Sequence, residues 1–116
     1  DKTARIGMAM VNQKLQRYQE SLEEFNRLIV DYPKDVSLLK ARAELEVEMN
    51  TLELALLDLE SAVKMAPNDA EIYVMCGDIY MAQGRNREAY VAYEKAVELG
   101  VPRPELHDRL KASKKK

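Results

Sequence analysis

The side chains best suited to chemistry in this sequence are one cysteine, Cys76, and one histidine, His107. Nucleophilic catalysis needs a nucleophile with a base within reach. Cys76 falls on the apolar stripe of a predicted helix, whereas His107 falls near the C-terminus. A thiol on such a stripe is typical of a buried, inert cysteine. We therefore predict no catalytic residue, and we do not expect the chain to be an enzyme.

Carboxylates are the other candidates for chemistry, and Glu44, Glu46 and Glu48 form the densest group. Residues that alternate along a helix do not share one face. We interpret this group as solvated charge and predict no metal site. No glycine-rich loop is present to hold a phosphate group, so no cofactor is expected either.

The composition narrows the class of protein. The chain has 116 residues, 47% hydrophobic and 33% charged, with a formal net charge of −2. This length is enough for a single folded domain, and the charge does not favour a nucleic-acid partner. No apolar run reaches the about 18 residues of a membrane span. A single cysteine leaves the compartment undetermined. The chain begins at Asp1 rather than Met, so it is either a processed product or a fragment. No capping segment precedes the first repeat, so we expect the chain to be part of a longer protein.

The elements that position these side chains repeat along the chain. Pro33 recurs as Pro67, and Asp35 recurs as Asp69, both with a period of 34. A fixed period of this length indicates stacked helical units. The sequence divides into three repeats at residues 2–35, 36–69 and 70–103, followed by a capping helix at 104–113 and a basic tail at 114–116.

Each repeat is predicted to form two helices, because apolar residues recur at helical spacing. Asp35 and Asp69 are expected N-caps, and Gly84 is expected to end a helix in the left-handed conformation. The fold class is all-α, with about seven helices. They are predicted at residues 2–15, 18–31, 36–49, 52–65, 70–83, 86–99 and 104–113.

The same motif positions recur in phase in all three repeats. The third repeat carries Tyr73, Cys76, Gly77, Tyr80, Ala89, Tyr93 and Ala96. The second repeat carries Ala43, Ala55, Leu59, Ala62 and Pro67, and the first carries Met8, Ala9, Phe25 and Pro33. This pattern resembles the tetratricopeptide repeat family. The resemblance implies a right-handed α-α superhelix that acts as a protein-protein interaction scaffold.

Five residues depart from the family pattern, and one of them is Val101, which stands where the pattern has Pro in the third repeat. Arg42 and Glu46 replace apolar or aromatic residues in the second repeat, and they can pair with each other because they are four residues apart on one helix. They form either a local polar seam or a polar contact to a partner. Arg5 and Asn12 stand at normally aromatic positions of the first repeat. The outer face of that repeat is then either solvated or in contact with something outside this chain.

The resemblance also implies a concave groove lined by the first helix of each pair, where a partner protein or peptide lies. The predicted groove residues are Ile6, Met10, Gln13, Lys40, Glu44, Val47, Glu71, Val74, Asp78 and Met81. Their mixture of apolar and acidic side chains favours a partner segment with apolar and basic residues. As alternatives, Tyr90, Val91 and the first helix could form a homo-oligomer, or the chain could be an accessory domain of a larger envelope protein or enzyme.

Some family members bind the acidic C-terminal carboxylate of chaperones through a clamp of Lys, Asn and Arg. The matching positions here are Ile6, Met10, Ala41, Glu71 and Met75. None of them supplies the side chain that the clamp needs. We therefore predict that an acidic C-terminal peptide is not a ligand.

Overall fold

The computed structural model describes residues 1–114, and over that range the chain is all-α, with seven α-helices and one short 3-10 helix. The chain forms two compact units, Asp1–Met65 and Ala66–Lys116. Lys115 and Lys116, the last two residues of the predicted basic tail, lie outside the described residues. Within the described range, no helix is both long and apolar enough to cross a membrane.

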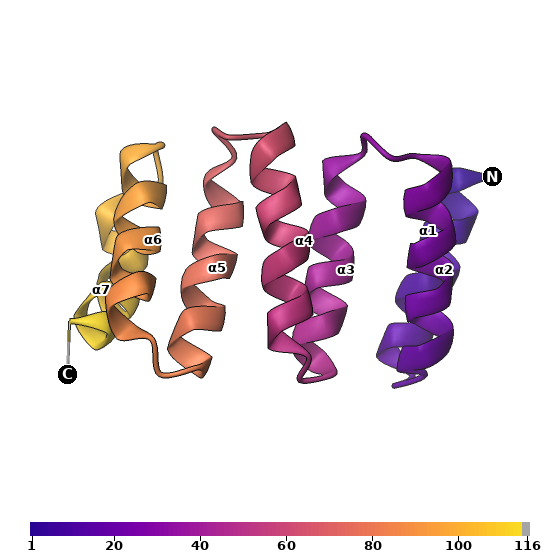
Figure 1. The fold of residues 1–116 in the computed structure, drawn as a ribbon, viewed down its shortest axis with the longest axis horizontal. Helices are drawn as coiled ribbons and strands as arrows, with labels where there is room; N and C mark the ends of the chain where they lie inside the picture. Colours follow the sequence, from indigo (N-terminus) through magenta and orange to yellow (C-terminus); the bar gives the residue numbers. More distant parts are fainter. Residues whose placement is uncertain (115–116) are drawn as a thin grey trace. The chain divides into compact units, whose positions relative to one another are not determined.

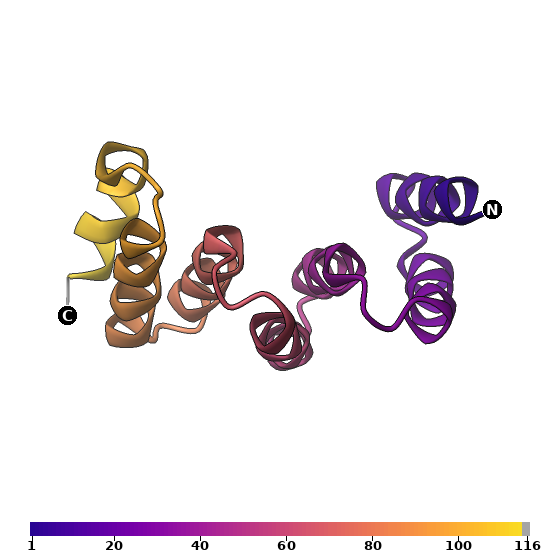
Figure 2. The same ribbon diagram turned by 90° about the horizontal axis from the view of Figure 1, so that it is seen from above.

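Four helices make up the first unit: α1 (Lys2–Lys14), α2 (Tyr18–Asp31), α3 (Val36–Glu48) and α4 (Leu52–Met65). Each helix packs against the next one along the chain, so that α2 contacts both α1 and α3. These helices form the indigo to magenta part of the ribbon (Figure 1). Seen from above, α1 lies at the end of this unit beside α2 (Figure 2). These bounds agree with the predicted helices to within one residue.

The second unit contains α5 (Ala70–Ala82), α6 (Asn86–Glu98), the 3-10 helix η1 (Arg103–Leu106) and α7 (His107–Ser113). Over the segment expected to be one capping helix, the chain therefore forms a 3-10 turn followed by a short α-helix. Pro102 and Pro104 supply no backbone N–H, which suits the start of such a segment.

Aspartate side chains begin three of the helices. Asp1 accepts a bond from the Ala4 amide at 2.8 Å, and Asp35 accepts one from the Ser37 amide at 3.0 Å. Asp69 does the same for Glu71 at 3.1 Å. Each bond satisfies an amide that has no partner inside its helix, so the predicted caps at Asp35 and Asp69 are confirmed.

A left-handed residue follows the first helix of each pair. Gln16 and Asn50 both have a φ of 60°, and Gly84 has a φ of 75°. These three residues occupy the same position of their repeats, so the turn recurs with the same period as the helices. Of the three, only Gly84 carries no steric cost there.

The core of the first unit lies on both sides of α2. Phe25 and Leu28 of α2 are fully buried together with Ala9 of α1 and with Leu38 and Leu45 of α3. The buried Ser21 hydroxyl donates to the Ala9 carbonyl oxygen at 2.7 Å. Small residues at these positions let α1 and α2 approach closely.

The core of the second unit is built around Tyr93 of α6. A Cβ atom placed on Gly77 would lie 2.4 Å from the Tyr93 ring, so only glycine fits where α5 meets this ring. Leu106 and Leu110 pack against the same cluster. They close the end of the unit, as the cap predicted for this segment requires.

Candidate functional site

The predicted groove residues of the first unit lie on α1 and α3, and all keep some exposure. Met10 is 53% exposed and Val47 is 39% exposed. The Gln13 amide donates to the Glu48 carboxylate, which joins α1 to α3 beside both apolar residues. This unit therefore presents apolar side chains next to carboxylates.

In the second unit the predicted groove residues take part in internal packing. Val74 and Met81 pack against the Tyr93 cluster. Asp78 accepts bonds from the Tyr93 hydroxyl at 2.5 Å and from Arg109 Nε at 2.9 Å. Burial and the bond to Asp78 both raise the pKa of Tyr93, so the phenol stays protonated. Asp78 thus links α5, α6 and α7.

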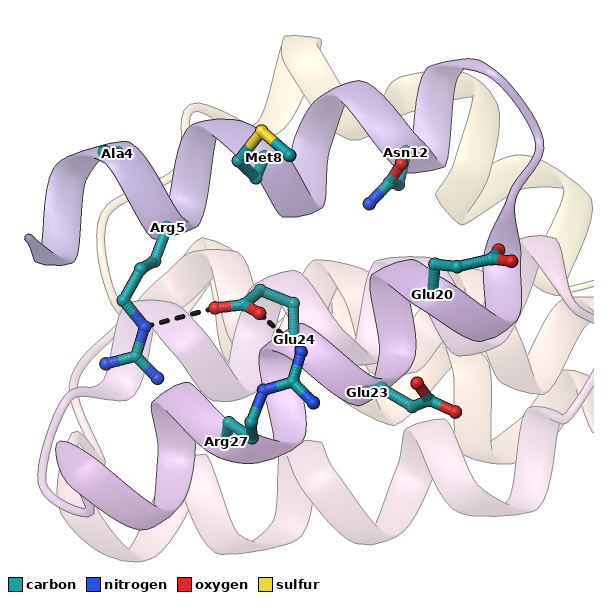
Figure 3. A pocket seen from close by; sticks show the side chains of 8 residues that line it. All are labelled: Ala4, Arg5, Met8, Asn12, Glu20, Glu23, Glu24 and Arg27. Atoms are coloured by element: carbon teal, nitrogen blue, oxygen red, sulfur yellow. Dashed lines mark hydrogen bonds and ion pairs between the residues drawn. The ribbon is translucent and has the colours of Figure 1, made fainter.

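A cleft that the sequence did not predict as a site lies between α1 and α2 (Figure 3). Its volume is about 380 Å³. Its walls are Ala4, Arg5, Met8 and Asn12 of α1 and Glu20, Glu23, Glu24 and Arg27 of α2. Arg5 and Asn12 are two of the departures from the family pattern. That departure was the signal in the sequence that could have located the cleft.

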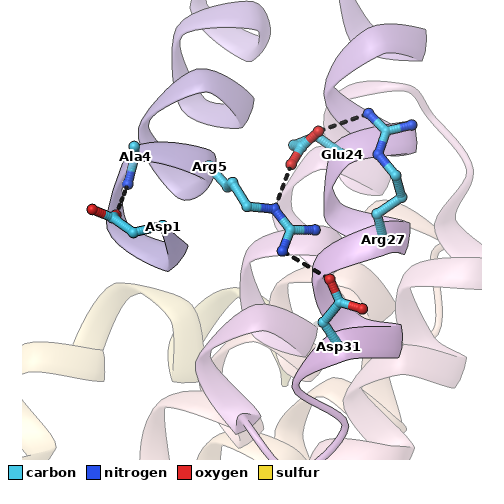
Figure 4. A network of polar contacts seen from close by, with 6 residues as sticks. All are labelled: Asp1, Ala4, Arg5, Glu24, Arg27 and Asp31. Carbon is cyan, nitrogen blue, oxygen red and sulfur yellow. Dashed lines mark hydrogen bonds and ion pairs between the residues drawn. The ribbon is translucent and has the colours of Figure 1, made fainter.

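Ion pairs occupy one end of this cleft (Figure 4). Arg5 donates to Glu24 at 3.1 Å and to Asp31 at 2.8 Å, and Arg27 donates to Glu24 at 2.7 Å. The bonds from Arg27 and Arg5 lower the pKa of Glu24. Both arginines of the cleft are therefore already bound to carboxylates of this chain.

A partly buried polar cluster links α2, α3 and α4. Arg42 donates to both carboxylate oxygens of Asp58, at 2.8 and 2.5 Å, and to Asn26 at 2.9 Å. Glu46 is only 5% exposed, and its Oε1 atom has no hydrogen-bond partner. Burial, together with the neighbouring Asp58, raises the pKa of Glu46 to about 8. Arg42 thus bonds to Asp58 and Asn26, and the interpretation of Glu46 as solvated charge is wrong.

The remaining reactive groups lie apart from one another. Cys76 is half-buried on α5, and burial raises the pKa of its thiol to about 11. His107 is exposed at the start of α7. Between residues 1 and 114, no three His, Cys, Asp or Glu side chains are grouped so that they could hold a metal ion.

Comparison with known proteins places the chain in a family. The sequence profile of the tetratricopeptide repeat matches residues 47–113, which is more than half of the chain. The chain belongs to the tetratricopeptide repeat family. Among curated protein sequences, none matches it significantly.

Three solved structures illustrate the likeness. A tetratricopeptide repeat protein from Parabacteroides merdae is 30% identical, with a TM-score of 0.84, and the match covers 97% of this chain and 44% of that one. This chain thus spans less than half of that relative.

The other two are similar in fold. The type III secretion chaperone SycD of Yersinia enterocolitica, in complex with a peptide of the translocator YopD, is 18% identical, with a TM-score of 0.84. The first tetratricopeptide domain of Spaghetti, bound to the HSP90 peptide SRMEEVD, is 19% identical, with a TM-score of 0.86. Each match covers 97% of this chain and 91% or 90% of the relative, respectively.

Proposed function

We propose that this chain is a non-catalytic protein-binding module that holds a partner segment with apolar and basic residues. Membership of the tetratricopeptide repeat family supports a role in protein-protein interaction. Two solved relatives of the same fold hold peptides, one from YopD and one from HSP90. We infer that the partner's segment binds along α1 and α3, the first helices of the first two repeats.

The observation that carries this proposal is the surface formed by α1 and α3. Met10 and Val47 are exposed there, and Glu44 and Glu48 lie within one turn of Val47. Exposed apolar side chains gain by losing contact with water, and methionine adapts its shape to different partners. The neighbouring carboxylates favour Lys and Arg in the bound segment.

Peptide charge gives the first test of this function. We expect the HSP90 peptide SRMEEVD, which binds Spaghetti, to give no measurable binding to this chain by calorimetry. The reason is that the five positions corresponding to the carboxylate clamp hold no Lys, Arg or Asn. A micromolar or tighter dissociation constant would overturn this expectation.

Substitution on the surface gives the second test. Short peptides with alternating apolar and basic residues would be compared on an array with matched acidic peptides. Met10→Lys and Val47→Lys should each weaken binding of the basic set by about tenfold, which corresponds to about 1.4 kcal/mol. Val91 of α6 is 67% exposed, and Val91→Lys is the matched control. Equal binding by all three variants would contradict the assignment.

A further inference from the structure

Helix α3 is joined to both of its neighbours through the polar cluster. Arg42 of α3 donates to both carboxylate oxygens of Asp58 on α4 and to Asn26 on α2. Glu46 follows Arg42 by four residues on α3 and hydrogen-bonds with the same Asp58. These four residues therefore bridge the first and the second repeat.

The cluster holds two acidic groups but only one cation. Glu46 is 5% exposed and Asp58 is 7% exposed. Arg42 directs its bonds to Asp58 and Asn26, whereas the Oε1 atom of Glu46 has no hydrogen-bond partner. A second negative charge would therefore be buried without compensation, which is costly away from water.

A proton on Glu46 removes this cost. Two carboxyl groups can share a hydrogen bond only when one of them keeps its proton. Asp58 is already paired with Arg42 as a carboxylate, so the proton belongs to Glu46. Burial and the same Asp58 raise the pKa of Glu46 to about 8, although Arg42 acts in the opposite direction. At neutral pH this side chain therefore donates a hydrogen bond and carries no charge.

The surroundings of Glu46 are simple enough to assign its proton. Arg42 of α3 and Asp58 of α4 are the charged groups that face it. Helix α2 contributes the neutral Asn26, which contacts the cluster through Arg42. A change in the charge of Glu46 is therefore felt by all three helices.

The second unit offers an internal reference. One repeat later, the positions of Arg42, Glu46 and Asp58 hold no carboxyl group, since their counterparts are Cys76, Tyr80 and Ala92. Burial raises the pKa of the Cys76 thiol to about 11. Helices α5 and α6 therefore have no carboxyl proton to lose at this place.

The cluster lies next to the α1/α3 surface. Val47 and Glu48 directly follow Glu46 on α3. Val47 is exposed on that surface, and Glu48 accepts a hydrogen bond from Gln13 of α1. Helix α1 packs on α2, and α2 packs on α3. The position of Val47 relative to α1 thus depends on α3 staying packed against its neighbours.

We propose that the buried proton of Glu46 holds α3 in place, and that its loss opens the joint between α2, α3 and α4 and disrupts the α1/α3 surface. Opening lets the ionised carboxylate reach water. The joint is thus most firmly closed at low pH, and it opens progressively as the pH rises toward about 8. The opening stands on the polar cluster alone, whereas its effect on a partner rests on the proposed function.

Amide hydrogen exchange of the whole chain measures this opening. The open joint releases the proton near the ordinary pKa of 4.5, and the closed joint releases it near 8. After correction for the intrinsic exchange rate, the opening constant of α3 and α4 amides should rise about tenfold per pH unit between these two values and then level off. The amides of α5 and α6 should show no such rise. A flat profile in α3 and α4, or the same rise in all four helices, would overturn the proposal.

Variants assign the rise to one proton. Glu46→Gln keeps the size and polarity of the side chain but cannot ionise, so the opening of α3 should no longer depend on pH. Asp58→Asn frees Arg42 to pair with an ionised Glu46, so the rise should disappear there too. Glu60→Gln is the matched control, because Glu60 is exposed on α4, and it should keep the full rise. Circular dichroism checks the fold at each pH, and an unchanged rise in Glu46→Gln would contradict the assignment.

A peptide links the joint to the surface. The probe is a synthetic peptide of alternating Leu and Lys, with a peptide of alternating Leu and Glu as its control. At about one hundred times its dissociation constant, the Lys peptide should lower the opening constant of α3 about a hundredfold, because it binds the closed joint. Binding that leaves the opening unchanged would overturn the link. If the Lys peptide does not bind, the proposed function fails, and the pH profile of α3 still decides whether the joint exists.

Discussion

The helix pairs α3/α4 and α5/α6 place opposite chemistry at the same repeat positions. Arg42 and Glu46 of α3 correspond to Cys76 and Tyr80 of α5, one repeat period later. In the first pair, Arg42 donates two hydrogen bonds to the buried carboxylate of Asp58. In the second pair these positions carry no formal charge. A repeat interface can therefore be built with charge or without it.

The two pairs also differ in how closely their helices are filled. The buried Tyr93 ring rests on Gly77 in α5/α6, whereas Leu59 and Ala43 hold the equivalent positions in α3/α4. A large ring against a glycine and a leucine near an alanine are two ways to fill the space between paired helices. The α5/α6 pair thus depends on shape, whereas the α3/α4 pair depends on charge balance.

The largest expected effect follows from breaking that balance. Arg42→Met leaves the Asp58 carboxylate buried without its cation, and it should lower the free energy of unfolding by about 3 kcal/mol. Urea unfolding followed by circular dichroism measures the loss. The matched control is Arg109→Met, because Arg109 and Asp78 form an exposed pair that should cost less than about 1 kcal/mol. Equal losses would show that charge burial does not distinguish the pairs.

The next effect tests the dependence of α5/α6 on shape. Gly77→Ala forces a methyl group into the Tyr93 ring and should cost about 2 kcal/mol, as overpacking does. Gly7→Ala is the control, because nothing lies within 4 Å of a Cβ atom there. Alanine favours the helix, so this control should gain about 0.5 kcal/mol. Thermal unfolding of both variants should show shifts of opposite sign.

A third test measures how the free energy of unfolding depends on pH through Glu46. The folded chain holds the Glu46 proton up to a pKa of about 8, whereas the unfolded chain releases it near 4.5. The stability from this raised pKa is complete below pH 4.5 and is lost as the pH rises through about 8. Arg42 of α3 and Asp58 of α4 are the charged groups that face this carboxyl.

Glu46→Gln should remove this dependence. At about pH 9 the variant should exceed the parent chain in unfolding free energy by about 1 kcal/mol, because a buried charge is absent. Urea unfolding from about pH 4 to 9 should show the difference between the two growing with pH. A constant difference across that range would mean that the pKa of Glu46 is the same in the folded and the unfolded chain.

The smallest effect concerns the hydroxyl of Tyr93. Tyr93→Phe removes the hydroxyl's bond to Asp78 but leaves the bond from Arg109 to Asp78. We therefore expect the free energy of unfolding to fall by about 0.5 kcal/mol. Tyr73→Phe is the control, because its hydroxyl makes an exposed bond of 3.3 Å to the Pro67 carbonyl oxygen. Thermal unfolding should show a smaller shift for the control.

The helices and their caps could be predicted because local signals specify them. Asp35 and Asp69 cap through their own side chains, and the repeat period carries each assignment from one unit to the next. The turns were predicted only in part. Gln16 and Asn50 adopt the left-handed conformation without being glycine, because the repeat geometry imposes it.

The partners of Arg42 and Glu46 and the exposure of Met8 on α1 could not be predicted in the same way. Helical periodicity places Glu46 between two other glutamates, and only the packed α4 shows that it lies beside Asp58. Met8 matches the family pattern and gives no sign of its exposure. Whether a face is covered depends on which helix stands next to it. That information is held by tertiary packing rather than by local sequence.

The contact between Arg42 and Asn26 limits how freely these repeats could be rearranged. A gene that duplicated residues 36–69 in tandem would place the copied arginine opposite position 60, the counterpart of Asn26, which is a glutamate. The new junction would then hold a third carboxylate beside the copies of Glu46 and Asp58. Although the repeats share one length, this unit is matched to its present neighbour and cannot be exchanged as a neutral module.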